Sequence, residues 1–226
     1  MNWTAPVDIY CERVSPEFWA EPWNAASNAA FIIAALWAWR TMRNTGTQSP
    51  ILVALTALAF CIGIGSFLFH TYANAWSELA DTLPIWTFVA VYIMACIHIR
   101  AGVPPRRIAI IALGIAAAVI VGTLAFDTAD TAQATQASWS NGSEQYLPAV
   151  IALLVLSVLS LKRNHPLRYW FVSATAIFIV SLGFRTVDFH TCEALHVGTH
   201  FMWHILNGVM IALLLQALIR HRAAHP

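Results

Sequence analysis

Charged side chains are scarce in this sequence. Asp, Glu, Lys and Arg make up 10% of its 226 residues, whereas soluble domains carry about 25%. Hydrophobic residues reach 59% and the mean hydropathy is +0.65. This composition excludes an ordinary soluble domain and predicts a membrane protein. The formal net charge of +1 gives no reason to expect nucleic acid as a partner.

Several familiar patterns are also missing. The four cysteines do not form a zinc-ribbon or disulfide-scaffold pattern. No internal repeat supports a transporter, and no G-x-S-x-G motif supports a rhomboid-type serine protease. The acidic N-terminus lacks the basic region of a cleavable signal peptide, so none is expected. No long extramembrane domain is expected, so no protein partner is implied.

Long apolar runs are the main positive feature of the sequence. Runs of about 18 or more apolar residues predict membrane-spanning helices. The sequence has seven of them, at residues 24–42, 51–72, 82–99, 108–126, 146–162, 168–187 and 199–220. The predicted fold is therefore an all-α integral membrane bundle of seven transmembrane helices. Residues 1–226 are expected to form a single domain, in which residues 1–23 are an acidic N-terminal segment.

Basic residues divide unevenly between the two sides of this seven-span arrangement. Ten of the twelve Lys and Arg residues fall on one side, which the positive-inside rule assigns to the cytoplasm. All eleven acidic residues fall on the other side, where Arg13 and Arg185 are the only basic residues. The pattern predicts an extracytoplasmic N-terminus and a cytoplasmic C-terminus. In a bacterium, the location would be the plasma (inner) membrane.

Three histidines are the candidate metal ligands. His200 and His204 are four residues apart, so on a helix they share one face. His70 ends the second predicted span near the same membrane surface. A catalytic zinc ion usually takes three protein ligands and a water, although imidazole also binds other transition metals. Interhelical hydrogen bonds or an interfacial location would also explain such histidines.

Ser66 and Asp81 lie near the same predicted membrane surface as these histidines. Ser66 precedes His70 by four residues, and Asp81 is placed just before the third predicted span. A carboxylate can accept and return a proton, and a hydroxyl can donate to a developing oxyanion. Zinc would lower the pKa of its bound water to about 7. Together they predict hydrolysis of an acyl bond in a lipid. Alternatively, Asp81 only caps a helix and Ser66 bonds to its own backbone.

The N-terminal segment contains four carboxylates, at Asp8, Glu12, Glu17 and Glu21. Such oxygens can bind a hard cation such as calcium, or they can form a solvated acidic end. Cys11 and Cys192 both fall on the outer side. In an oxidising compartment they could form a disulfide.

Three sequence blocks resemble the alkaline ceramidase family, within the wider group of seven-span hydrolases that includes the adiponectin receptors. They are D-I-Y-C-E…A-E-P-W-N-A-A-S-N, G-S-F-L-F-H…D and H-F-M-W-H. The short termini and the Y-C-E-R form look like a prokaryotic member. The resemblance implies zinc ligands at His70, His200 and His204, an acid/base at Asp81 and a transition-state hydroxyl at Ser66. It also implies a calcium site, for which the matching positions are Asp8, Tyr10, Glu12, Val14 and Glu21.

The function that the resemblance implies is zinc-dependent hydrolysis of the amide of ceramide, or of a related N-acyl lipid, on the extracytoplasmic side. The products would be a sphingoid base or other amine and a fatty acid, and the substrate would come from the bilayer. The alternative is a lipid-sensing receptor with a structural zinc ion, as in the receptor branch of the same group. A ligand that binds without turnover would favour this alternative.

Overall fold

The computed structural model describes residues 2–101, 103–104, 106–107, 110 and 139–225. Apart from Ile110, the span predicted at residues 108–126 lies outside the described residues. The statements below concern the described part of the chain.

The described chain is helical. Its α-helices are α1 (Pro22–Ser27), α2 (Ala29–Thr45), α3 (Pro50–Tyr72), α4 (Ala75–Ala101), α7 (Leu147–Lys162), α8 (Arg168–Val187) and α9 (His200–Ala224). Two short 3₁₀ helices, η1 (Ser143–Tyr146) and η2 (Phe189–Thr191), precede α7 and follow α8. There is no β-strand in the described residues, where the β pairing is an isolated bridge between Pro6 and Asn74. The all-α prediction is confirmed for this part of the chain.

Five helices are long and apolar enough to cross a membrane: α3, most of α4, η1 with α7, α8 and α9. Helix α2 has 17 residues, which is at the short end of the range that spans a bilayer. These helices support a multi-pass membrane protein. The number of spans and their orientation stay predictions.

The predicted start of the third span was wrong by seven residues. Helix α4 begins at Ala75, where the Asn74 side chain accepts a hydrogen bond from the Ser77 backbone N–H (3.2 Å) and so caps the helix. The first turns of α4 contain polar residues, so the apolar run in the sequence begins later than the helix does. Asp81 therefore lies two turns inside α4 rather than at its mouth. Pro84 also lies inside the helix.

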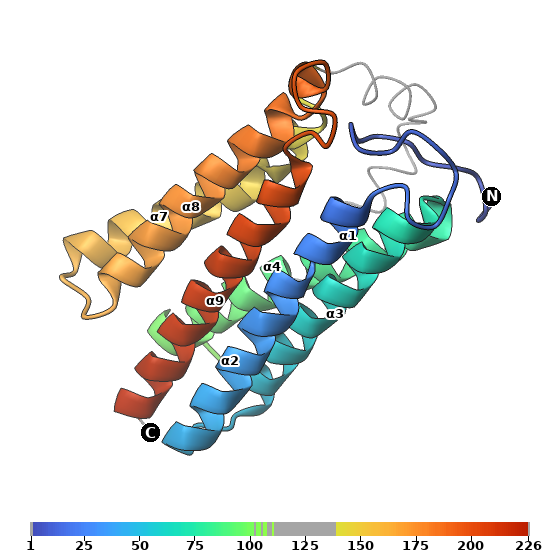
Figure 1. Ribbon diagram of the computed structural model, residues 1–226. Helices are drawn as coiled ribbons and strands as arrows, with labels where there is room; N and C mark the ends of the chain where they lie inside the picture. The colour runs from blue at the N-terminus through green and yellow to red at the C-terminus, as the bar shows by residue number, and fades with distance from the viewer. Residues whose placement is uncertain (1, 102, 105, 108–109, 111–138, 226) are drawn as a thin grey trace.

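The helices pack as neighbours in one bundle (Figure 1). Helix α3 packs against α4 and α2, α9 packs against α2 and α8, and α7 packs against α8. A Cβ atom on Gly208 of α9 would lie only 2.5 Å from the Ala30 Cβ of α2, so glycine permits this close approach. The termini lie at opposite ends of the bundle. The N-terminal segment and the α8–α9 loop lie at the same end.

Candidate metal centre

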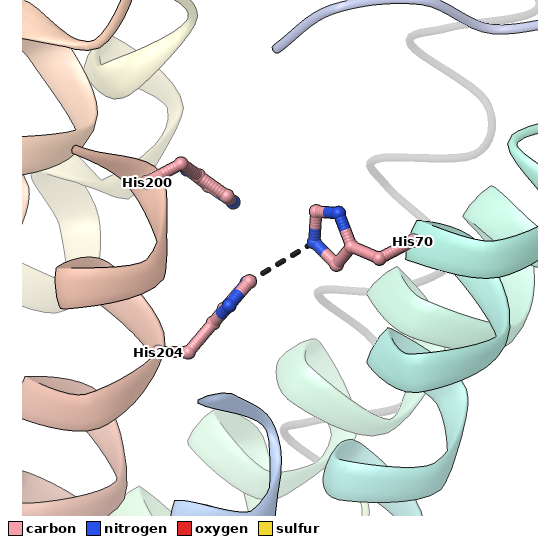
Figure 2. A group of neighbouring side chains, drawn as sticks. All are labelled: His70, His200 and His204. Carbon is pink, nitrogen blue, oxygen red and sulfur yellow. Dashed lines mark hydrogen bonds between the residues drawn. The ribbon is translucent and has the colours of Figure 1, made fainter. Parts of the chain in front are cut away.

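Three buried histidines from two helices meet at the end of the bundle that carries the N-terminal segment. His70 lies in the last turn of α3, and His200 and His204 occupy the first two turns of α9 (Figure 2). One ring nitrogen of each lies within 4.8 Å of the others, and no other such group of His, Cys, Asp or Glu occurs in the described residues. Each side chain is at most 2% exposed. The structure therefore brings together the three predicted ligands.

Hydrogen bonds orient two of these rings. The Nδ1 atom of His70 lies 2.6 Å from Glu21 Oε2, and the Nδ1 atom of His204 lies 2.8 Å from Ser27 Oγ. The Ser27 hydroxyl donates to the Asn24 carbonyl (2.8 Å), so its oxygen accepts from His204. Both Nδ1 atoms therefore carry protons. In neutral rings, both Nε2 atoms are left with free lone pairs.

The two free Nε2 atoms lie 3.1 Å apart. Neutral rings with protonated Nδ1 atoms cannot hydrogen-bond to each other through Nε2, so their lone pairs would repel. A cation between them removes that repulsion. A tetrahedral zinc site with Zn–N bonds of about 2.0–2.1 Å separates its nitrogens by about 3.3 Å. The donor set and the spacing of His70 and His204 therefore fit zinc.

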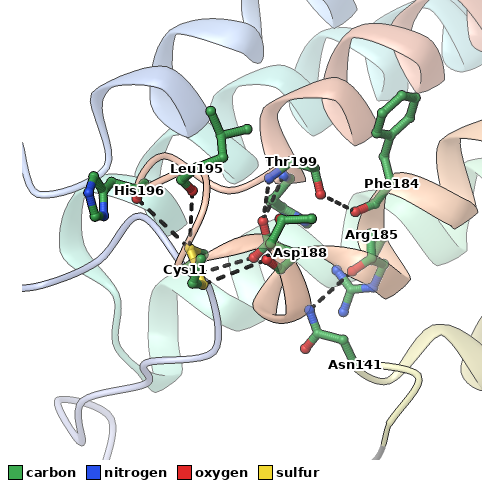
Figure 3. The surroundings of a disulfide bond; sticks show 11 residues. Cys11, Asn141, Phe184, Arg185, Asp188, Leu195, His196 and Thr199 are labelled. Atoms are coloured by element: carbon green, nitrogen blue, oxygen red, sulfur yellow. Dashed lines mark hydrogen bonds between the residues drawn. A yellow bond between two sulfur atoms is a disulfide. The ribbon is translucent and has the colours of Figure 1, made fainter.

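His200 is held differently. Its ring stacks on the Tyr10 ring, with centroids 3.7 Å apart, and its buried Nδ1 has no hydrogen-bond partner. Its backbone N–H donates to Asp188 Oδ1 (2.9 Å), as does the N–H of Thr199 (2.7 Å). The other oxygen, Oδ2, accepts from the N–H of Cys11 (3.0 Å) (Figure 3). Asp188 is fully buried and fixes the first residue of α9 against the N-terminal segment.

A disulfide joins Cys11 to Cys192 in the structure (Figure 3). The bond links two segments separated by 181 residues in the sequence. The same two segments meet at Asp188, where the Cys11 N–H is bound. The pairing is the one proposed from the sequence, and it lies next to the start of α9.

Ser66 and Asp81 are brought together by a close approach of α3 to α4. A Cβ atom on Gly65 would overlap the carbonyl oxygen of Ala80. Pro84 has no N–H to bond that carbonyl within α4. A Cβ atom at Gly65 would also lie 3.2 Å from the backbone nitrogen of Asp81. Ser66 and Asp81 follow these two close positions in the chain, and both are buried. Asp81 Oδ1 is buried without a partner, so it is available to a water or substrate.

The residues proposed for calcium do not form an open oxygen cage. Both Glu12 oxygens accept backbone N–H groups at the start of α1, from Trp23 and Asn24 (2.8 Å each). Asp8 is exposed, and Val14 is 87% exposed. Burial raises the pKa of Glu12, with smaller opposing effects from the two N–H groups.

A buried guanidinium lies beside the remaining carboxylate of this set. Arg13 Nε donates to Glu21 Oε1 (2.5 Å), and Arg13 Nη2 donates to the carbonyl of His70 (3.0 Å). Arg13 Nη1 donates to the carbonyls of Ser15 (3.1 Å) and Glu17 (3.5 Å). Arg13 thus binds the kind of oxygens that a calcium ion would need, and the arrangement does not fit calcium.

Glu21 stays ionised in this setting. Burial alone would raise its pKa, but the hydrogen bonds from His70 and the Asn24 amide and the charge of Arg13 lower the pKa below its ordinary value. An ionised Glu21 keeps the proton on His70 Nδ1, which leaves Nε2 free for a metal.

An apolar cavity of about 430 Å³ opens beside the metal centre. Phe31, Trp203, Asn207 and Arg163 are among the residues that line it. The Phe31 ring centroid is 6.4 Å from that of His204, which places the cavity next to the ligands. A cavity of this size and character suits a hydrocarbon chain.

Sequence reasoning missed several residues that support this site. Asp188 binds Cys11 and Ser27 binds His204, each 177 residues away in the chain, so no local spacing marks them. Arg13 and Arg185 did carry a signal, because they alone broke the charge pattern. Both are buried, and Arg185 donates to the Tyr10 hydroxyl (2.8 Å). Burial raises the pKa of that hydroxyl, so Tyr10 stays neutral.

A comparison with known protein families identifies the same family that the three sequence blocks resemble. The family model described as Ceramidase matches residues 2–225, nearly the whole chain. No curated protein matches the chain.

Proposed function

This chain belongs to the ceramidase family, and on that premise we propose that it is a zinc-dependent amide hydrolase of the membrane. Its substrate would be ceramide or a related N-acyl lipid, and its products an amine and a fatty acid. One observation carries the metal assignment: two histidine Nε2 atoms with free lone pairs lie 3.1 Å apart. His70, His200 and His204 would hold the ion.

The residues around the ligands have complementary roles in this proposal. A zinc ion would polarise the amide carbonyl and lower the pKa of a water to about 7. Asp81 would accept the proton of that water at its unpartnered Oδ1 and return it to the leaving nitrogen. Ser66 would donate a hydrogen bond to the carbonyl oxygen as negative charge develops there. The apolar cavity would hold one hydrocarbon chain of the lipid.

The test is to replace one ligand and measure both metal and turnover. His200→Ala should abolish stoichiometric zinc and reduce amide hydrolysis by at least about 1,000-fold, while the detergent-solubilised protein stays folded. Asp81→Asn should retain zinc and lose about 100-fold or more in kcat. A zinc-loaded wild-type protein that binds N-acyl lipids without cleaving them would contradict the proposal and favour a receptor.

We further propose one seven-span domain over residues 1–226, with the metal centre on the extracytoplasmic side. The distribution of basic residues supports this orientation. Protease accessibility of tags at the two termini, in sealed inner-membrane vesicles of known orientation, tests it. Tags that are both accessible from the same side would contradict an odd number of spans.

A further inference from the structure

One polar side chain in the cavity has no structural role in the described part of the protein. Asn207 lies on α9, three residues inward from His204, and lines the cavity. It is 5% exposed, and its Oδ1 has no hydrogen-bond partner. An unpartnered polar group costs free energy in an apolar interior. Such a residue is expected where a ligand completes its hydrogen bonds.

Asn207 differs from the other buried amide side chains in its hydrogen bonds. Four buried amide side chains have an unpartnered oxygen: Asn24, Asn28, Asn207 and Gln216. Three of them donate through nitrogen to a protein group, which explains their presence: Asn24 to Glu21 (3.0 Å), Asn28 to the Asn24 carbonyl (2.8 Å) and Gln216 to Thr41 (2.9 Å). Asn207 alone among these four has no side-chain hydrogen bond within the described residues.

We infer that Asn207 recognises a hydroxyl group of the substrate, close to the amide that is cleaved. This inference rests on the proposed function and specifies its substrate. A helix rises about 1.5 Å per residue, so Asn207 lies about 4.5 Å deeper along α9 than His204. An extended chain advances about 1.2 Å per bond. The hydroxyl should therefore lie within about three or four bonds of the scissile carbonyl.

Two parts of an N-acyl lipid can supply such a hydroxyl. It can lie on the third carbon of the acyl chain, or on the amine side at a similar distance from the carbonyl. The chemistry at Asn207 is the same in both cases, because its Oδ1 accepts from the hydroxyl. Which of the two hydroxyls Asn207 binds depends on whether the acyl chain or the amine-side chain of the lipid enters the cavity.

The decisive experiment compares four amides of equal chain lengths. One has no hydroxyl near the amide, one has it on the acyl side, one on the amine side, and one on both. We expect the purified wild-type protein to prefer one singly hydroxylated amide over the plain amide by about tenfold or more in kcat/KM. Equal kcat/KM values for all four would overturn the inference without any variant being needed.

Asn207→Leu should bring that preference close to one, because leucine has a similar volume and no acceptor. A ratio of two kcat/KM values does not depend on the fraction of folded protein, so a merely structural role would not change it. Gln216→Leu is the matched control: it removes another buried amide of α9, outside the cavity lining, and should keep the preference. An unchanged preference in Asn207→Leu would contradict the inference.

A binding measurement separates this inference from the proposed function. Asp81→Asn protein is titrated with the same four amides, and the rise in melting temperature is measured. A larger rise with a hydroxylated amide, lost in the Asp81→Asn/Asn207→Leu double variant, would support hydroxyl recognition even if the wild type cleaved no amide. Hydrolysis in the wild type combined with hydroxyl-independent binding and turnover would overturn the inference alone.

Discussion

Two regions of the chain hold the three histidines, and they do so in different ways. The N-terminal region, residues 8–28, holds His70 and His204 through ring Nδ1 atoms. The α8–α9 loop, residues 188–199, holds His200 through its backbone N–H. The first region therefore sets which ring nitrogen faces the centre of the histidine cluster. The second sets where α9 begins and hence where both of its histidines lie.

The two regions also hold each other. Cys11 is joined to Cys192, and its N–H binds Asp188. Next to these contacts, Tyr10 stacks on His200 of α9 and accepts a hydrogen bond from Arg185 of α8. Damage to the loop should therefore lower stability and metal content together, whereas damage to the N-terminal hydrogen bonds should lower metal affinity with a smaller loss of stability.

The largest effect is expected for Asp188→Ala. This change leaves three buried N–H groups without an acceptor, which costs about 3–9 kcal/mol in total. The melting temperature of the solubilised protein should fall strongly, and zinc content should fall with it. Asp188→Asn keeps one carbonyl acceptor and should be intermediate. Glu193→Gln, an exposed acid in the same loop, should have no effect; a wild-type melting temperature in Asp188→Ala would show that the loop does not anchor α9.

Glu21→Gln should have the next largest effect. It should weaken metal binding, and it should also lower the melting temperature because the buried Arg13 guanidinium loses its carboxylate partner. Loss of a carboxylate behind a metal-bound histidine typically lowers metal affinity by about 10–100-fold. Competition with a zinc chelator measures this change. Glu17→Gln, an exposed glutamate of the same segment, is the control. Equal zinc affinities in the two variants would mean that the Glu21 contact does not orient His70.

Ser27→Ala should weaken zinc binding by less, on the order of a few-fold, because a neutral oxygen supports an imidazole less than a carboxylate does. Ser27→Thr keeps the hydroxyl and should bind zinc like the wild type if the added methyl group is accommodated. The same chelator competition orders the variants. If Ser27→Ala lost as much zinc affinity as Glu21→Gln, the two N-terminal contacts would contribute equally to zinc binding, contrary to this prediction.

The sequence predicted the parts of this structure that depend on local pattern. The run at 168–187 coincides with α8, and the spacing of His200 and His204 placed both on one face of α9. The start of α4 was missed because a polar cap at Asn74 begins the helix before its apolar part. The supports of the histidines were missed because they are long-range: Ser27 and His204 are 177 residues apart. Burial of Arg13 depends on contacts that only the fold creates.

The smallest effect is expected for calcium, and it tests the N-terminal region directly. Because Arg13 already binds Glu21 and three carbonyl oxygens, neither calcium nor a calcium-selective chelator should change the melting temperature or zinc content. Arg13→Met removes the charge while keeping much of the side-chain volume, and it should lower the melting temperature because the ionised Glu21 is then buried with fewer donors. A calcium-dependent rise in the melting temperature of the wild type would show that the guanidinium does not take the place of the ion.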